Sequence, residues 1–450
     1  MIFQQIAKDI LPDKTLREGL WRAVFLTALM VLHASCTVSV EMPIEMPPED
    51  NLREEYTLKI VTPSGHSVRA LYEIAEVFSR NYPLTTAEVS VISGTVPINT
   101  FLISKFAVGD VPDILIYQGG SDIELFAQGN HLLDLSDAGF EGRFSMETED
   151  ACRYQGRLYA LPLDISISGL FVQMSVLWQG AVRNNDIRII PGTLDEFIES
   201  CVKLRRAGIE YPIVIGASSG SGAAIFLFQY MYQNLYTPNP HFYEEILRGE
   251  RNWTDKEFRD MYRAYEQLRQ YVNPDAARIS DIEAIRRFAE GEAAYYLGLS
   301  RDIATIRRFK QNLDMVLVPS PWGNKFPKPV FAGVDTVVSA SALTPYPEEV
   351  KAFLGEFTSV YGANLYSQAA GSISTVKDTS VWYDSSLGAR YEIFNDGTLN
   401  QFMSRKWLLG FEDAFRRLNR EWFTGRSAAS ILEELERIHW DMLAAGKDGL

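Results

Sequence analysis

The chain has 450 residues, of which 46% are hydrophobic and 22% charged, so its length allows two lobes with ample core material. Its formal net charge of -15 argues against a nucleic-acid partner, because phosphate binding requires clustered Lys and Arg. The doublets Arg286–Arg287 and Arg307–Arg308 are too short to form a basic stripe. No metal site is expected either, because the three cysteines form no CxxC pair and the five histidines are scattered.

The amino terminus resembles an export signal. Basic residues within 1–22 precede an apolar run over 23–32, which is too short to span a bilayer comfortably. Ala34 and Ser35 before Cys36 resemble a bacterial lipoprotein cleavage box, although His33 stands where Leu is usual. We expect residues 1–35 to be a signal peptide and Cys36 to carry a lipid. The alternative is an uncleaved anchor or a short helix near the membrane.

The acidic, proline-containing stretch 36–55 reads as a flexible tether. The body then alternates strands and helices. Strands are predicted at Leu58–Val61, Glu88–Ile92 and Ile114–Ile116, and apolar residues between Val68 and Phe78 recur at helical spacing. This βαβαβ order predicts a largely parallel α/β sheet, which binds ligands in loops beyond the carboxyl ends of its strands. Those loops contain Ser64, Gly65, Gly94, Tyr117 and Gln118.

Further along the chain, capping boxes predict helix starts at Thr193–Glu196, Thr254–Glu257 and Ser280–Glu283. Pro347 opens another helix. The serine- and glycine-rich loop 218–222 precedes an apolar helix over 223–236, and it lacks the Lys-Ser/Thr ending of a nucleotide-binding P-loop. It is therefore interpreted as a helix-opening loop.

Several segments in this order resemble the family-1, maltose-binding-like extracellular solute-binding proteins. The resemblance runs from about Tyr56 to the carboxyl terminus. Each segment alone is a weak match to the family, whereas the ordered set is a strong one. The matching stretches are 58–62, 111–117, 156–162, 169–171, 193–197, 207–213, 288–295 and 371–374.

Three departures from the family pattern concern the ligand. Val172–Gln173 stands where many relatives carry Tyr-Asn. The strand after Ala294 runs 295–300 without the Trp that commonly stacks on sugar, and 371–374 lacks a proline that is common there. The resemblance therefore leaves the identity of the solute open.

The resemblance implies a periplasmic-binding-protein-like fold of two α/β lobes around a hinge and a ligand cleft. Lobe 1 is expected to hold residues 56–163 plus 335–376, and lobe 2 residues 164–334 plus 377–450. The chain is expected to cross between the lobes near Leu163, Val334 and Val376.

A sugar site needs aromatic rings for C–H faces and planar polar groups for hydroxyls. By the resemblance, Tyr117 stands where an aromatic ring stacks on sugar, with Gln118 beside it. Asp164 is expected either to accept hydrogen bonds from ligand hydroxyls or to stabilise the hinge. Four further candidates are Trp253, Trp322, Phe331 and Asp335. For the three aromatic residues, packing in the core is the preferred interpretation.

These features favour a binding protein over an enzyme, since no nucleophile-elbow or metalloprotease motif occurs. We expect a monomer without cofactor, anchored outside the cytoplasm through Cys36, that delivers a carbohydrate to an ABC permease. The alternatives are a sensing subunit of a membrane receptor kinase and a secreted glycosidase. A disulfide between Cys152 and Cys201 and a pair of buried thiols both fit the sequence.

Overall fold

A computed structural model describes residues 55–63, 65, 67–92, 98–184, 190–323, 331–379, 384–387, 402, 406–408 and 410–448. The predicted signal peptide, its lipidation site Cys36 and most of the tether lie outside these residues, as do Ser64 and Gly94. The side chain of Phe331 is also outside the description, although its backbone belongs to a strand.

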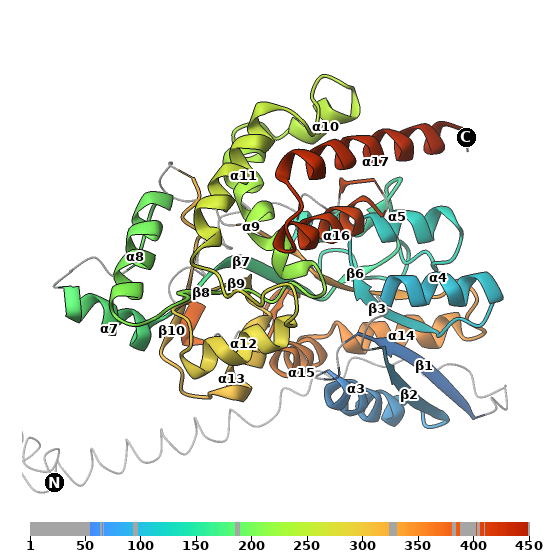
Figure 1. Cartoon of the computed structure of the whole chain (residues 1–450). Helices are drawn as coiled ribbons and strands as arrows, with labels where there is room; N and C mark the ends of the chain where they lie inside the picture. The colour runs from blue at the N-terminus through green and yellow to red at the C-terminus, as the bar shows by residue number, and fades with distance from the viewer. Residues whose placement is uncertain are drawn as a thin grey trace, which may run out of the picture. The chain divides into compact units, whose positions relative to one another are not determined.

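The first sheet has the strand order β2-β1-β3-β12-β6 (Figure 1). Strands β1 and β2 are parallel, as are β1 and β3, which confirms the predicted βαβαβ start. Strand β12 runs antiparallel to both β3 and β6. The bounds are β1 Tyr56–Thr62, β2 Thr85–Val91, β3 Ile114–Gln118, β6 Leu161–Pro162 and β12 Thr336–Ala340.

Helices on this part of the chain bury one face each against the strands. In α3 the buried residues include Leu71, Ile74 and Phe78, at the helical spacing that the sequence predicted. The bounds are α3 Val68–Asn81, α4 Ile98–Val108, α5 Ser121–Gln128, α6 Met146–Asp150, α14 Pro347–Phe357 and α15 Val360–Ala370, with a small hairpin of β4 Arg153–Tyr154 and β5 Arg157–Leu158.

The second sheet is built around β7, a ten-residue strand that is buried throughout. Its order is β10-β7-β9-β8, and β11 and β13 also pair with β7. Successive side chains of a strand point to opposite faces, so Ser166 and Ser168 share one face of β7, while Ile165 and Ile167 share the other. The bounds are β7 Asp164–Gln173, β8 Ile213–Val214, β9 Tyr295–Leu299, β10 Met315–Val318, β11 Phe331–Val334 and β13 Ile373–Ser374.

Most of the remaining helices surround this second sheet. One of them, α9, continues directly into a π-helical turn over Tyr232–Tyr236, at the end of the helix predicted for 223–236. The bounds are α7 Met174–Asn184, α8 Leu194–Arg206, α9 Ser221–Met231, α10 Phe242–Leu247, α11 Lys256–Arg269, α12 Asp281–Glu290, α13 Asp302–Phe309, α16 Phe411–Phe423 and α17 Ala428–Asp448.

The buried apolar side chains gather in separate clusters that follow the two sheets. One cluster takes its members from 56–163 and 334–376. Two others lie on the opposite faces of β7 and take theirs from 165–332, from Ile373 and from residues 387–435. We therefore propose the lobe boundaries expected from the sequence, with the difference that β13 hydrogen-bonds to the second sheet.

At two of the three predicted helix starts the expected side-chain N-cap forms. The hydroxyl of Thr193 accepts from the backbone N–H of Glu196, and that of Ser280 accepts from the N–H of Glu283. The third prediction was wrong, because α11 begins after Asp255 rather than after Thr254. The Asp255 carboxylate instead accepts from the N–H of Asn252 in the preceding turn.

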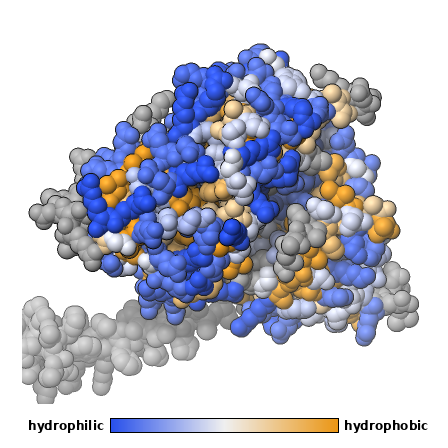
Figure 2. All heavy atoms as spheres, in the orientation of Figure 1, coloured by the Kyte–Doolittle hydropathy of each residue, from blue (hydrophilic) through white to orange (hydrophobic). Residues whose placement is uncertain are grey.

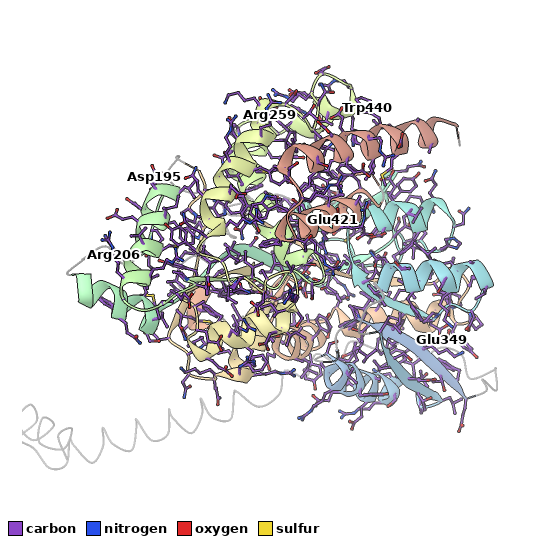
Figure 3. The ribbon with its side chains drawn as sticks, viewed as in Figure 1. Asp195, Arg206, Arg259, Glu349, Glu421 and Trp440 are labelled. Atoms are coloured by element: carbon purple, nitrogen blue, oxygen red, sulfur yellow. The ribbon has the colours of Figure 1, made fainter. Side chains whose placement is uncertain are left out.

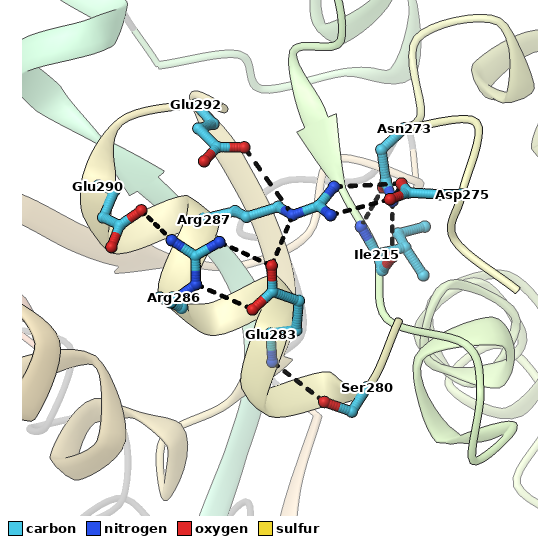
Figure 4. A network of polar contacts seen from close by, with 9 residues as sticks. All are labelled: Ile215, Asn273, Asp275, Ser280, Glu283, Arg286, Arg287, Glu290 and Glu292. Atoms are coloured by element: carbon cyan, nitrogen blue, oxygen red, sulfur yellow. Dashed lines mark hydrogen bonds and ion pairs between the residues drawn. The ribbon is translucent and has the colours of Figure 1, made fainter. Parts of the chain in front are cut away.

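The arginine doublet Arg286–Arg287 on α12 belongs to a network of ion pairs (Figure 4). Arg286 contacts Glu283 and Glu290, while Arg287 contacts Glu283 and Asp275. Carboxylates therefore accompany both guanidinium groups, as expected for solvated helix faces.

Charged side chains also cover the ends of α8, where Asp195 lies in the first turn and Arg206 in the last, an arrangement that complements the helix dipole (Figure 3). The visible face is largely hydrophilic, with apolar residues in separate patches (Figure 2). Cys152 and Cys201 are buried free thiols, so the disulfide alternative is excluded. Among the described helices, none has the length and apolar character needed to cross a membrane.

Candidate functional site

Asp335 lies at the point where the chain passes from β11 in the second sheet to β12 in the first. Its backbone N–H donates to the carbonyl of Asp164 at 3.1 Å, and its carbonyl accepts from the N–H of Gly119 at 3.0 Å. Asp335 is buried, and its Oδ2 accepts from the Ser166 hydroxyl at 2.9 Å. Asp335 is thus fixed by residues that follow or begin strands of both sheets.

Arg301 completes this junction from the second sheet, because it follows β9 and precedes α13. One of its terminal nitrogens donates to Oδ2 of Asp335 at 2.6 Å. The Arg301 side chain is 40% exposed, whereas that of Asp335 is 3% exposed. A guanidinium has five N–H donors, so Arg301 keeps further donors besides the nitrogen that is bonded to Asp335.

Asp164, at the start of β7, is the second carboxyl group of the junction. It is buried, and its Oδ1 accepts from the backbone N–H of Thr336 at 2.9 Å. Burial, together with the negative charge of Asp335, raises the pKa of Asp164 to about 7. Asp164 therefore gives up its proton far less readily than an ordinary carboxyl group.

Gln229 of α9 fixes the middle of β7 on the same face as Ser166. Its amide nitrogen donates to the Ser168 hydroxyl and to a backbone carbonyl, at 2.9 and 3.0 Å. Its carbonyl oxygen accepts from Ser320 and from the indole N–H of Trp322, at 2.6 and 2.9 Å. The buried amide thus has partners for both its donor and its acceptor.

A further polar group forms at the start of α9 and α12. The Ser219 hydroxyl donates to Asp281 at 3.0 Å, and Arg416 of α16 donates to the Ser221 hydroxyl at 3.1 Å. Arg416 also pairs with Glu412 on its own helix. Burial raises the pKa of Asp281, while the charges of Arg301 and Arg416 lower it.

The chemistry of these groups is that of hydrogen bonding to a polar molecule. Carboxylates, hydroxyls and guanidinium groups approach one another where the chain passes between the sheets. Within the described residues, no set of three or more His, Cys, Asp or Glu side chains is arranged to hold a metal ion.

Comparison with known proteins assigns the family. The family model of the bacterial extracellular solute-binding proteins matches residues 63–361, well over half of the chain. The chain belongs to this family. The resemblance recognised in the sequence and the two-lobed α/β fold are thereby confirmed.

Individual relatives of this solute-binding protein are distant. An uncharacterized ABC transporter extracellular-binding protein of Pyrococcus horikoshii is 21% identical over 360 residues, covering 78% of each chain. A chitin oligosaccharide binding protein is 19% identical with a TM-score of 0.75, covering 87% of this chain and 99% of its own. A solute-binding protein in complex with raffinose, RafE, is 17% identical with a TM-score of 0.72, covering 86% and 100%.

Tyr117, the ring expected to stack on sugar, lies inside the core of the solute-binding protein. It is fully buried, its hydroxyl bonds to Ser339 at 2.9 Å, and its ring packs against Phe126. The reason is that β3 extends through Gln118, two residues beyond the predicted strand end. No face of the Tyr117 ring is open to a ligand in this structure.

Two predicted tryptophans are likewise packing residues. Trp253 is fully buried, with its ring against Phe258 and Phe411. Trp322 is 3% exposed and packs edge-on against Phe197 while donating to Gln229. Core packing, the preferred interpretation for both, agrees with these contacts.

The remaining predicted residues divide between the junction and the rest of the molecule. Asp164 and Asp335 are brought together, and half-buried Gln118 pairs in register with Thr336 at the same edge of the first sheet. Gly65 is exposed in its loop, with open space around it.

Sequence reasoning missed Arg301 and Ser166, which complete the junction with Asp335. A signal for Arg301 was present, because the strand over 295–299 lacks the family's tryptophan and is followed by Ser300 and a basic residue. Ser166 gave no such signal, since a serine two residues into a buried strand is compatible with a purely structural role.

Proposed function

We propose that this protein is the solute-binding subunit of an ABC importer and that its solute is a sugar or oligosaccharide. Support comes from the family assignment together with two structural neighbours whose names record a chitin oligosaccharide and raffinose. The observation that carries the proposal is the junction around Asp335, where hydrogen-bonding groups meet between the two sheets.

In this proposal the solute lies against the junction. Arg301 would donate to solute oxygens through the N–H groups that Asp335 leaves unused. Gln118 would supply an amide from the first lobe, and the loop containing Gly65 would lie at the edge of the site. Asp335 would act through Arg301 by holding its guanidinium, and Asp164 would support the crossing. Closure of the lobes on the solute would deliver it to a permease.

We also propose that the protein binds sugar without converting it, in keeping with the solute-binding family. Incubation with raffinose and chitin oligosaccharides should leave both unchanged by chromatography. Steady release of monosaccharide that is lost in an Asp164→Asn or Asp335→Asn variant would contradict this part of the proposal.

The proposed anchor is a lipid on Cys36, which would hold the exported protein at the membrane through the tether 36–55. Metabolic labelling with a fatty-acid analogue should mark the wild-type protein and spare Cys36→Ala. Equal labelling of both proteins would remove Cys36 as the acylation site.

The sugar proposal is tested by a thermal-shift screen of the purified body against raffinose, stachyose, chitin oligosaccharides and their monosaccharides. A solute that binds only the native state increases the free energy of unfolding, by about 2.7 kcal/mol when its concentration is a hundred times Kd, and it thereby raises Tm. At least one oligosaccharide should raise Tm in proportion to the logarithm of its concentration. If amino acids or peptides stabilise the protein and no sugar does, the solute class is wrong.

A further inference from the structure

A cavity of about 170 Å³ lies between α13 and α15, two helices that belong to different lobes. The strand β13, which hydrogen-bonds to the start of β7, contributes to its wall. In Figure 1 both helices lie on the same side of the strands, with α15 next to α13. The cavity is thus placed where the two lobes meet.

This cavity is on the opposite side of β7 from the proposed solute site. Its apolar lining residues Ile303, Ile373 and Leu387 belong to the same cluster as Ile165 and Ile167 of β7. Ser166, which bonds to Asp335, points to the other face because side chains alternate along a strand. The two sites therefore lie on opposite faces of β7, and they come closest in sequence where Ser300 of the cavity precedes Arg301.

The charged groups of the cavity neutralise each other. Arg307 of α13 donates to both oxygens of Asp384, at 2.6 Å each, and to the carbonyl of Leu313. The pKa of Asp384 is lowered because this pairing outweighs its burial. A bidentate pair of this kind leaves no unbalanced charge for an ionic ligand.

The polar groups that remain are the buried hydroxyl of Ser372 and two side-chain amides on α15. Asn364 and Gln368 are four residues apart, so they lie on one face of the helix, and both line the cavity. Neither amide hydrogen-bonds to another described residue. The hydroxyls of Ser300 and Ser374, by contrast, accept from the backbone N–H groups of Ile167 and Val376.

We infer that this cavity is a second ligand site, which takes a small neutral polyol. Each amide offers a donor and an acceptor, the combination that a hydroxyl group needs. The apolar wall of Ile303, Ala304 and Ile373 suits the C–H surface of such a molecule. A volume near 170 Å³ limits the ligand to a few carbon atoms, since a cavity of roughly 150 Å³ accommodates one benzene.

The test uses the purified protein with its isoleucine and leucine methyl groups labelled for NMR, titrated with xylitol. We expect xylitol to shift the methyl signals of Ile303, Ile373 and Leu387. Loss of one neutral hydrogen bond in Asn364→Leu or Gln368→Leu should weaken the interaction roughly threefold to tenfold. If the Gln368→Leu variant fails to fold, Gln368→Glu is used in its place, because it keeps the shape of the side chain and loses the amide donor.

Two controls make the result specific. Gln128→Leu removes an amide from the exposed face of α5 and should leave the titration unchanged. Arg301→Gln, at the proposed solute site, should also leave it unchanged, so the outcome is independent of whether that site binds sugar. Xylonate should bind more weakly than xylitol, because the one cation among the described lining residues, Arg307, is paired with Asp384.

Three results would overturn the inference. They are the absence of methyl shifts at 100-fold more xylitol than protein, an affinity for xylitol that is unchanged in Asn364→Leu and Gln368→Leu, and shifts that disappear in Arg301→Gln. The last would place xylitol at the proposed solute site.

Discussion

Asp164 illustrates how one buried side chain can set the pH response of the molecule. Its pKa in the folded protein is raised to about 7 by burial and by Asp335, from an ordinary value near 3.8. Between these pH values the native state keeps a proton that the unfolded state has lost. Stability contributed by Asp164 is therefore present at low pH and falls as pH rises through this window.

Replacing Asp164 by Asn should remove that fall. The amide keeps an oxygen acceptor for the N–H of Thr336, and it does not ionise. Each pKa unit corresponds to about 1.4 kcal/mol. As pH rises from 4 to 7, the free energy of unfolding of Asp164→Asn should therefore increase relative to that of wild type by on the order of a few kcal/mol. Denaturant unfolding across this range measures it, with exposed Asp195→Asn as control. Parallel curves for wild type and Asp164→Asn would contradict the account.

His439 should produce the opposite slope. This residue of α17 is fully buried against Trp253 and Phe411, and neither ring nitrogen has a partner among the described residues. Burial lowers its pKa from 6.5 to about 4, so the folded protein keeps it neutral. Its contribution to stability is present above pH 6.5 and is lost as pH falls toward 4.

A His439→Leu variant should accordingly resist acid better than wild type, by on the order of 3 kcal/mol at pH 4. Melting temperatures measured from pH 4 to 8 give the comparison, and His241→Leu, which removes an exposed histidine, is the matched control. If His439→Leu and wild type lose Tm equally on acidification, protonation of His439 does not limit stability.

At the scale of elements, helix starts were the most predictable feature because caps act within four residues. Thr193 and Ser280 cap α8 and α12 as the local pattern predicts. The prediction at Thr254 was wrong because Asp255, the next residue, has an extended backbone and occupies the position before α11. Strand ends were less predictable. The extension of β3 to Gln118 depends on pairing with β12, more than 200 residues later, and it buried Tyr117.

The caps give a direct comparison between two threonines. Thr193→Ala removes the acceptor for the N–H of Glu196 and should cost about 1 kcal/mol of stability. Thr254→Ala removes no cap and should change the free energy of unfolding by less than about 0.5 kcal/mol. Chemical denaturation of both variants tests the assignment, and equal losses would mean that the side-chain cap of α8 contributes nothing.

At the scale of the whole molecule, strand alternation together with family resemblance predicted two lobes, and the chain switches sheets near the expected residues. Asp164 and Asp335 were identified because they stand next to those crossings. Arg301 was not, since its contact with Asp335 joins a strand end and a crossing that only the fold brings together. The partner of a charged side chain across such a junction depends on long-range geometry, which local sequence does not encode.

The most direct test of the sugar-binding account is calorimetric titration of Arg301→Gln with the oligosaccharide that gives the largest shift in Tm. Loss of charged hydrogen bonds should cost about 1.5–3 kcal/mol of binding, which is at least tenfold in Kd. The Asp335 side chain is 3% exposed, and Arg301→Gln removes the guanidinium that pairs with it, so Tm without ligand should also fall. The titration is therefore run at a temperature at which both proteins are folded, where the account predicts weakened binding by the variant. Unchanged affinity would make Arg301 a structural residue and place the solute elsewhere.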